Sequence, residues 1–110
     1  MDIKQKSINA GGIKLFIEDG GKEIGHAYLY ILKNDLHEKP FGFMEDVFVE
    51  EEYRSRGLGS KLVEELIKAA KQNDCYKLFG TSRNERPKVH ALYSRLGFKD
   101  WGKEFRMDFK

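Results

Sequence analysis

The stretch that decides the fold is Phe43-Met44-Glu45-Asp46-Val47-Phe48-Val49, followed a few residues later by Arg54-Ser55-Arg56-Gly57-Leu58-Gly59-Ser60. The first part is rich in β-branched and aromatic residues and predicts a buried strand over residues 41–50. The apolar period then changes, because apolar residues recur at helical intervals at Leu58, Leu62, Leu66 and Ala70. The sequence therefore predicts a strand, a glycine turn and an amphipathic helix in direct succession.

The glycine turn has the composition of an anion site. Glycines let the backbone approach a ligand closely, and the first N–H groups of a helix point outward at its positive end. Arg54 and Arg56 can add charge-assisted contacts, and the Ser60 hydroxyl can add one more. A pyrophosphate suits this turn better than a single charge. The alternative is that Gly57 and Gly59 merely permit a tight turn and the arginines are solvated.

Other phosphate-binding loops fail on spacing. The dinucleotide pattern G-x-G-x-x-G requires a third glycine where Leu62 stands. Gly59-Ser60-Lys61 lacks the Gly-Lys-Ser/Thr order of a Walker loop, and a kinase-type loop would need a downstream catalytic signature that is missing. The turn therefore belongs to none of these three classes.

The remaining strands, turns and helix are predicted from the spacing of apolar residues and from the turn residues. Strands are expected at 3–8, 13–18, 23–32 and 76–82, in addition to 41–50, and a last β segment is expected at the end of the chain, over 98–101 and then 105–109. Asp19-Gly20-Gly21 predicts a hairpin turn, and Asn73-Asp74 ends the first helix. Pro87 begins a second helix and Gly97 ends it. The element order β-β-β-β-α-β-α-β predicts an α+β (mixed α/β) fold with a mostly antiparallel sheet and two main helices.

Composition and charge limit the remaining classes. A chain of 110 residues with 40% hydrophobic and 35% charged residues predicts one folded domain, residues 1–110. Cys75 is the only cysteine and the histidines lack ligand spacing, so neither a disulfide nor a metal is expected. The net charge of +2 does not favour nucleic acid. Since no apolar run suits a membrane span or a signal peptide, we expect a cytoplasmic protein without a membrane partner.

Two motifs together resemble a known family. Arg54-x-x-Gly57-x-Gly59 follows Asp46-Val47-Phe48-Val49, and the run from His90 through Tyr93 to Gly97-Phe98 comes some thirty residues later. This combination resembles the GCN5-related N-acetyltransferase (GNAT) superfamily over roughly residues 41–101. Members usually begin with one or two helices that cover the acceptor site, and no helical stretch precedes the hairpin here. The expected fold is therefore GNAT-like with the N-terminal helices missing.

The resemblance implies where acetyl-CoA binds. Its pyrophosphate would lie on the turn formed by Arg54, Ser55, Arg56, Gly57, Leu58, Gly59 and Ser60, and its pantetheine amides would pair with the backbone of Phe48 and Val49. Asn84 is a further pantetheine candidate, although nine residues separate it from Tyr93. Arg83, Arg86 and Lys88 are candidates for the 3′-phosphate, or form a solvated charged face.

The resemblance also suggests catalytic residues. An amine with a pKa near 10.4 is only about 1 part in 2,500 neutral at pH 7, so a base helps the reaction. Met44-Glu45-Asp46-Val47-Phe48-Val49 resembles the strand of polyamine acetyltransferases, which makes Glu45 the preferred base; Asp46, or no protein base, remains open. Strand alternation lets only one of the two carboxylates face the cleft. Tyr93 matches the family tyrosine whose hydroxyl lies near the CoA sulfur.

These residues predict an acetyl-CoA-dependent N-acetyltransferase that moves the acetyl group to a primary amine of a small molecule or peptide by direct attack. The alternative is a non-catalytic acyl-CoA-binding or regulatory module with the same fold. Residues 51–110 carry a net charge of +5 and residues 1–50 a net charge of −3, so an anionic ligand would prefer the second half. The aromatic-rich segment Trp101–Phe109 is a candidate homodimer contact.

Overall fold

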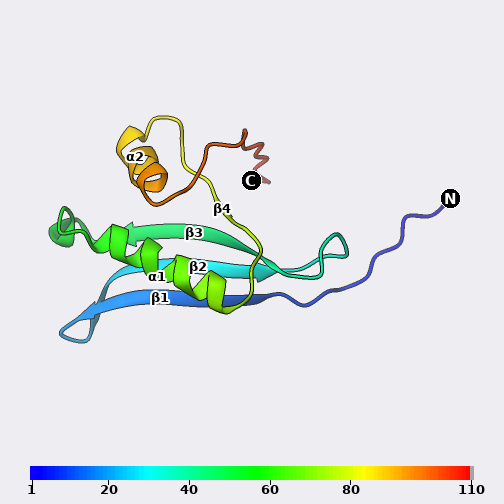
Figure 1. Cartoon of the computed structure of the whole chain (residues 1–110), viewed down its shortest axis with the longest axis horizontal. Coiled ribbons are helices and arrows are strands. Elements are labelled where there is room, and N and C mark those ends of the chain that lie inside the picture. The colour runs from blue at the N-terminus through cyan, green and yellow to red at the C-terminus, as the bar shows by residue number, and fades with distance from the viewer. Residues whose placement is uncertain (110) are drawn as a thin grey trace.

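The computed structural model describes residues 1–109 as a four-stranded sheet with two α-helices (Figure 1). The strands are β1 (Gly11–Asp19), β2 (Lys22–Leu32), β3 (Phe41–Val49) and β4 (Leu78–Gly80). The helices are α1 (Leu58–Gln72) and α2 (Pro87–Arg95), with a short 3-10 helix, η1 (Glu51–Tyr53), after β3. The predicted α+β class with a mostly antiparallel sheet is confirmed.

The sheet has the order β1-β2-β3-β4. β2 pairs antiparallel with β1 on one side and with β3 on the other. β3 and β4 run parallel, and their pairing extends over three positions only, from Gly42 opposite Leu78 to Met44 opposite Gly80. Beyond Met44, the second half of β3 therefore has a free edge on the side of β4.

The core lies between the sheet and α1. Leu62, Val63, Leu66 and Ala70 form one buried face of α1 and pack against Ala27, Leu29 and Met44 of the sheet. This is the apolar face that the sequence period predicts, and it leaves the lysines and glutamates of α1 in solvent. α2 lies next to β3, at the edge of the sheet to which β4 belongs (Figure 1).

Turn residues end the elements where the sequence predicts. Gly20 and Gly21 have φ angles of 59° and 82°, as a tight hairpin requires. Asn73 ends α1, and its side-chain amide donates to the Ala69 carbonyl at 2.8 Å. Pro87 occupies the first turn of α2, and Gly97, with φ 103°, follows the end of this helix.

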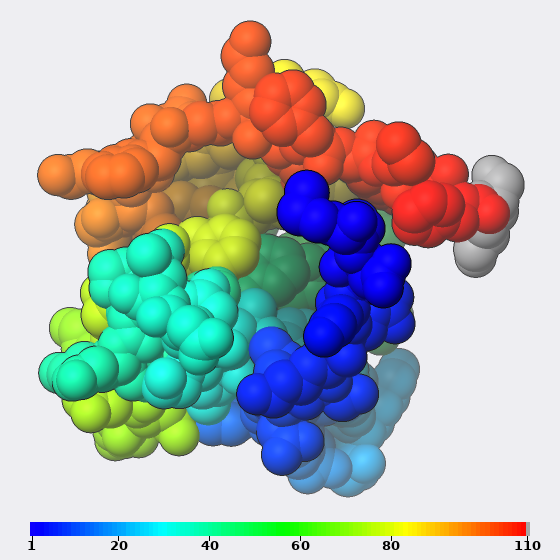
Figure 2. All heavy atoms as spheres, turned by 90° about the vertical axis from the view of Figure 1, so that its right-hand side faces the viewer, coloured from blue at the N-terminus to red at the C-terminus, as the bar shows by residue number. Residues whose placement is uncertain are grey.

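Three strand predictions need correction. Residues 3–8 and 98–109 form no strand, and the strand expected over residues 76–82 is only Leu78–Gly80. Trp101, Phe105, Met107 and Phe109 are 77–91% exposed, so the apolar face of their alternating pattern has no partner. Figure 2 shows the last residues (orange to red) running along one side of the molecule and the first residues (blue) projecting beside them. A strand requires a neighbouring edge, and sequence alternation does not supply one.

No helix among residues 1–109 combines the length and apolar character needed to cross a bilayer.

The radius of gyration is 16.0 Å, above the roughly 13 Å expected for a compact chain of this size. The extended ends of the chain account for this excess.

The contact between α1 and the sheet predicts a large effect of Leu66→Ala. Leu66 is fully buried, so truncation removes apolar contacts and leaves a cavity, and the free energy of unfolding should fall by about 2–5 kcal/mol. Glu64→Ala, on the exposed side of the same helix, should change it by less than about 0.5 kcal/mol. Urea denaturation of the two variants checks this; equal losses would contradict the assigned core.

Candidate active site

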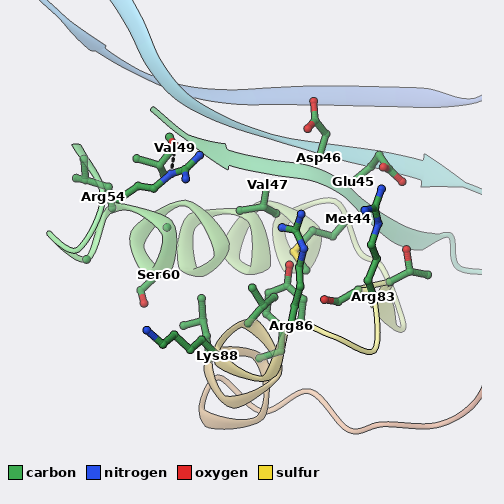
Figure 3. A pocket seen from close by; sticks show the side chains of 18 of the residues that line it. Met44, Glu45, Asp46, Val47, Val49, Arg54, Ser60, Arg83, Arg86 and Lys88 are labelled. Carbon is green, nitrogen blue, oxygen red and sulfur yellow. Dashed lines mark hydrogen bonds between the residues drawn. The ribbon is translucent and has the colours of Figure 1, made fainter. Parts of the chain in front are cut away.

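A cavity of about 990 Å³ opens where β3 and β4 part (Figure 3). The β2–β3 register shifts between His26 and Tyr28, and Asp46 has a φ of 52°, which a residue with a side chain rarely adopts. These are the features of a β-bulge, which bends and twists its strand. Because the parallel pairing stops at Met44, the bulged half of β3 turns away from β4 and forms one wall of the cavity.

The cavity is bounded by β3, the N-terminal turn of α1, the loop after β4, and α2. Among residues 1–109, five cationic side chains line it against three acidic ones, Glu45, Asp46 and Glu104. The cations are Arg54, Arg83, Arg86, Lys88 and Arg106. Figure 3 labels the first four of these, which lie on both sides of the opening. This excess of positive charge favours an anionic ligand.

The glycine turn presents backbone amides to the cavity. Gly57 precedes α1 with a φ of 77°, and the first intrahelical bond runs from the Lys61 N–H to the Gly57 carbonyl. The amides of Leu58, Gly59 and Ser60 therefore point out of the helix end, and all three residues line the cavity. A Cβ on Gly59 would meet no protein atom within 4 Å, so nothing in the described chain requires glycine there.

Arg54 joins the turn to the strand before it. Its Nε donates to the Val49 carbonyl at 2.7 Å, and its guanidinium lies 5.5 Å from the centre of the Phe48 ring. The Glu50 N–H donates to the Ile24 carbonyl, so antiparallel alternation turns the backbone of Phe48 towards β2 and that of Val49 towards the open edge. Of the two residues expected to pair with pantetheine, Val49 has its carbonyl on the cavity side.

Tyr93 and Glu45 lie on opposite walls of the cavity, on α2 and β3. Burial raises the pKa of Tyr93; the nearby Arg86 guanidinium lowers it and the Glu45 carboxylate raises it. The Tyr93 phenol therefore stays protonated at neutral pH and can donate a hydrogen bond.

Glu45 and Asp46 both contribute to the wall of the cavity, so the expectation that only one of the two carboxylates faces the cleft stays a prediction. The bulge interrupts the alternation from which that expectation came. The two side chains nevertheless point in different directions (Figure 3). The Asp46 carboxylate is held by His26 of β2, whose Nε2 lies 3.0 Å from Oδ2.

Most of the predicted site residues line the cavity, and three do not. Glu45, Val49, Arg54, Ser55, Gly57, Leu58, Gly59, Ser60 and Tyr93 are part of its wall. Phe48 places its ring on the other face of the sheet, against His26. Arg56 donates to the Glu52 carbonyl at 3.3 Å and lies 5.1 Å from the Tyr53 ring centre. Asn84 is exposed in the turn between β4 and α2.

Sequence reasoning missed Ser82, which lines the cavity after β4. Within residues 1–109, its Oγ is the one buried side-chain oxygen or nitrogen without a hydrogen-bond partner. Such an atom costs about 1–3 kcal/mol if it stays unpaired. A ligand in this cavity that offers a polar group would relieve that cost. No group of three His, Cys, Asp or Glu side chains in the described residues is arranged to hold a metal ion.

The comparisons with known proteins identify the family. The family model described as "Acetyltransferase (GNAT) family" matches residues 2–98. The chain belongs to this family. Glucosamine 6-phosphate N-acetyltransferases from Trypanosoma brucei brucei and Candida albicans are each 33% identical to it, over 80% and 76% of this chain. The chain spans 58% and 55% of the length of these two relatives.

Solved structures agree with this assignment. A glucosamine-6-phosphate N-acetyltransferase from Arabidopsis thaliana superimposes with a TM-score of 0.81 at 28% identity, covering 90% of this chain and 67% of that one. A Trypanosoma brucei acetyltransferase gives a TM-score of 0.80 at 27% identity, covering 90% and 70%. GNAT enzymes use acetyl-CoA. The amide-lined turn, the cationic wall and the unpaired Ser82 oxygen all fit that substrate.

Gly59→Ala should separate folding from ligand binding. Alanine has a higher helix propensity and meets no protein atom, so stability should stay equal or rise by up to about 1 kcal/mol. The added methyl group lies at the amide-lined turn, so the affinity for CoA should fall. Thermal unfolding and titration calorimetry check the two effects. Gly57→Ala is the contrasting variant, because its φ of 77° should make it destabilising. Unchanged CoA affinity of Gly59→Ala would contradict binding at this turn.

Proposed function

We propose that this protein is an acetyl-CoA-dependent N-acetyltransferase that transfers the acetyl group directly to a primary amine of a small molecule or peptide. One observation carries the proposal: in a member of the GNAT family, β3 and β4 part to form a cationic cavity that extends from the amides of the glycine turn to Tyr93. The turn binds a diphosphate and the far end receives the thioester.

The cofactor-binding roles follow from the position of each group. The Leu58, Gly59 and Ser60 amides, with Arg54, hold the pyrophosphate. The open edge of β3 at Val49 pairs with a pantetheine amide. The Val49 carbonyl then either accepts from the pantetheine amide in place of Arg54 or accepts from both. Arg83, Arg86 and Lys88 surround the cavity on the α2 side and meet the remaining phosphate. Roles for Phe48, Arg56 and Asn84 stay predictions.

The chemistry needs a neutral amine and a stabilised leaving group. The amine nitrogen forms a bond to the acetyl carbon, the carbon–sulfur bond breaks, and the amine loses a proton. Glu45 accepts that proton, directly or through water. The protonated phenol of Tyr93 donates a hydrogen bond to the departing thiolate, because full proton transfer from a group of raised pKa would be unfavourable.

The acceptor is a primary amine whose identity is a question for assay. Two of the relatives above are named for glucosamine 6-phosphate; others are a thialysine N-epsilon-acetyltransferase from Bos taurus and an aminoglycoside N(6')-acetyltransferase from Acinetobacter baumannii. These names define the acceptors to test first. A homodimer through residues 101–109, a cytoplasmic location and a single domain over residues 1–110 stay predictions.

The test is release of free CoA thiol in the presence of candidate amines. Acetyl-CoA is supplied with glucosamine 6-phosphate, thialysine, an aminoglycoside, a polyamine, amino acids and a peptide with a free amine. Acceptor-dependent thiol release supports the proposal. CoA binding without release on any amine would favour the non-catalytic acyl-CoA-binding module, and no CoA binding by folded protein would reject both.

Tyr93→Phe should lower kcat much more than CoA affinity. The change removes one hydrogen bond to a charged leaving group, worth about 1.5–3 kcal/mol, or about 10- to 150-fold in rate. The ring still packs 5.4 Å from Phe98, so the fold should be kept. Steady-state kinetics with the best acceptor and calorimetry with CoA measure the two quantities. Unimpaired turnover would remove Tyr93 from the mechanism.

Glu45→Gln should lower kcat by about 10²- to 10⁴-fold at pH 7, as expected when a general base is lost. The loss should shrink as pH rises, because more of the amine is then neutral without help. Glu104→Gln is the matched control, since it removes the same charge from the same cavity. A pH–rate profile for both variants checks this. Similar losses in both would show that only cavity charge matters.

A further inference from the structure

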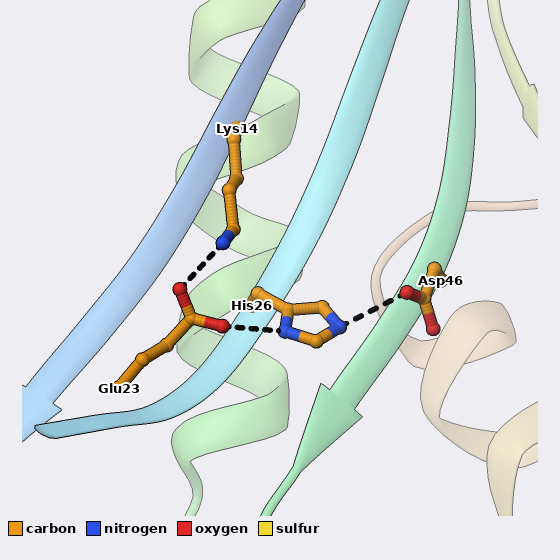
Figure 4. A network of polar contacts seen from close by, with 4 residues as sticks. All are labelled: Lys14, Glu23, His26 and Asp46. Atoms are coloured by element: carbon orange, nitrogen blue, oxygen red, sulfur yellow. Dashed lines mark hydrogen bonds and ion pairs between the residues drawn. The ribbon is translucent and has the colours of Figure 1, made fainter.

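A polar network crosses three strands on the sheet face opposite α1 (Figure 4). Lys14 of β1 contacts Glu23 of β2 at 2.5 Å, and the other oxygen of Glu23 lies 2.9 Å from Nδ1 of His26. Nε2 of His26 lies 3.0 Å from Asp46 of β3. His26 is therefore held between two carboxylates and connects β2 to the β3 bulge.

The network gives each ring nitrogen of His26 a carboxylate partner. A ring nitrogen that carries a proton can donate it to the carboxylate that it faces. Hydrogen bonds from Lys14 and His26 lower the pKa of Glu23, so this carboxylate stays charged. The His26 ring lies 5.5 Å from the Tyr28 and Phe48 ring centres, which fixes its plane.

Asp46 is the end of the network with an unusual backbone conformation. Its φ of 52° lies in the left-handed region, which aspartate adopts more readily than most residues with a Cβ but which still favours glycine. Such a conformation persists only where the surrounding structure determines it. Among residues 1–109, the one side-chain hydrogen bond or ion pair that Asp46 makes is with His26, at the point where the β2–β3 register shifts.

We propose that His26 is a positioning residue: it holds Asp46 in the left-handed conformation and so sets the bulge that directs Glu45 and the open edge of β3 into the cavity. The inference rests on the proposed function for its effect on turnover. Its structural part stands independently, because it concerns the backbone of the free protein. His26 is 19% exposed on the face away from α1, so it acts through Asp46 and not on the acetyl group.

The first experiment uses two amide replacements of His26. Gln places an amide nitrogen near the position of Nε2 and can still donate to Asp46, whereas Asn reaches only the position of Nδ1 and donates towards Glu23. The Cα chemical shift and the HN–Hα coupling of Asp46 report its φ in the free protein. We expect both to be kept in His26→Gln and to move towards extended values in His26→Asn. Unchanged values in His26→Asn would overturn the proposal, whether or not the protein turns over an amine.

The second experiment asks how the hydrogen bond between His26 and Asp46, called the clamp below, has its effect. It tests whether the clamp acts by offsetting backbone strain at Asp46. Gly adopts a positive φ without strain, so Asp46→Gly should make the bulge independent of His26. In the Asp46 background, His26→Asn should lower kcat/KM, or CoA affinity if no acceptor is found, by about tenfold or more. In the Asp46→Gly background the same change should have little effect. An equal loss in both backgrounds would overturn the mechanism, and melting curves identify any variant that fails to fold.

If wild-type protein binds no CoA, the proposed function fails while the chemical-shift comparison still decides the clamp. If wild-type protein is active and His26→Asn keeps both the Asp46 conformation and kcat/KM, the clamp alone fails. The two failures are therefore distinguishable.

Discussion

The structure of the site depends on where β3 stops pairing with β4. Parallel pairing lasts for three positions, and the bulge at Asp46 follows within two residues of its end. A strand that paired along its whole length would have no free amides or carbonyls to offer a ligand. Here the free edge of β3, the amides at the start of α1 and the side chains of α2 meet around one opening. The loss of β-pairing is what opens this cavity.

Features encoded within a few consecutive residues could be predicted from the sequence. The glycine turn, its position between a strand and a helix, and the tyrosine of α2 all depend on local conformation and on motif spacing. Glu45 and Asp46 show the limit of this reasoning. Their alternation was broken by a bulge whose hydrogen-bonding partner, His26, lies twenty residues away on another strand. Ser82 is similar, because a serine after a strand carries no signal until its burial is known.

The terminal segments show a different limit. Phe105, Met107 and Phe109 alternate with polar residues as a strand does, yet all three are exposed. Periodicity reports that a segment could bury one face; it does not report whether a neighbouring edge is present. β4 contributes only Leu78–Gly80 to the sheet edge, which is a short template for pairing. The sheet and α1 form their core without these segments.

Several features of the cavity lower the stability of the protein, and no contact within the part of the chain that the structure describes compensates for them. Gly59 lowers helix propensity where a Cβ would meet no protein atom, and Ser82 buries an oxygen without a partner. Arg83, Arg86 and Lys88 add like charges close together around the same space. These costs differ in kind, so a single accident of packing does not explain them. A polyanionic ligand with polar groups along its length would offset all of them together, which is the strongest internal argument that the cavity exists to bind one.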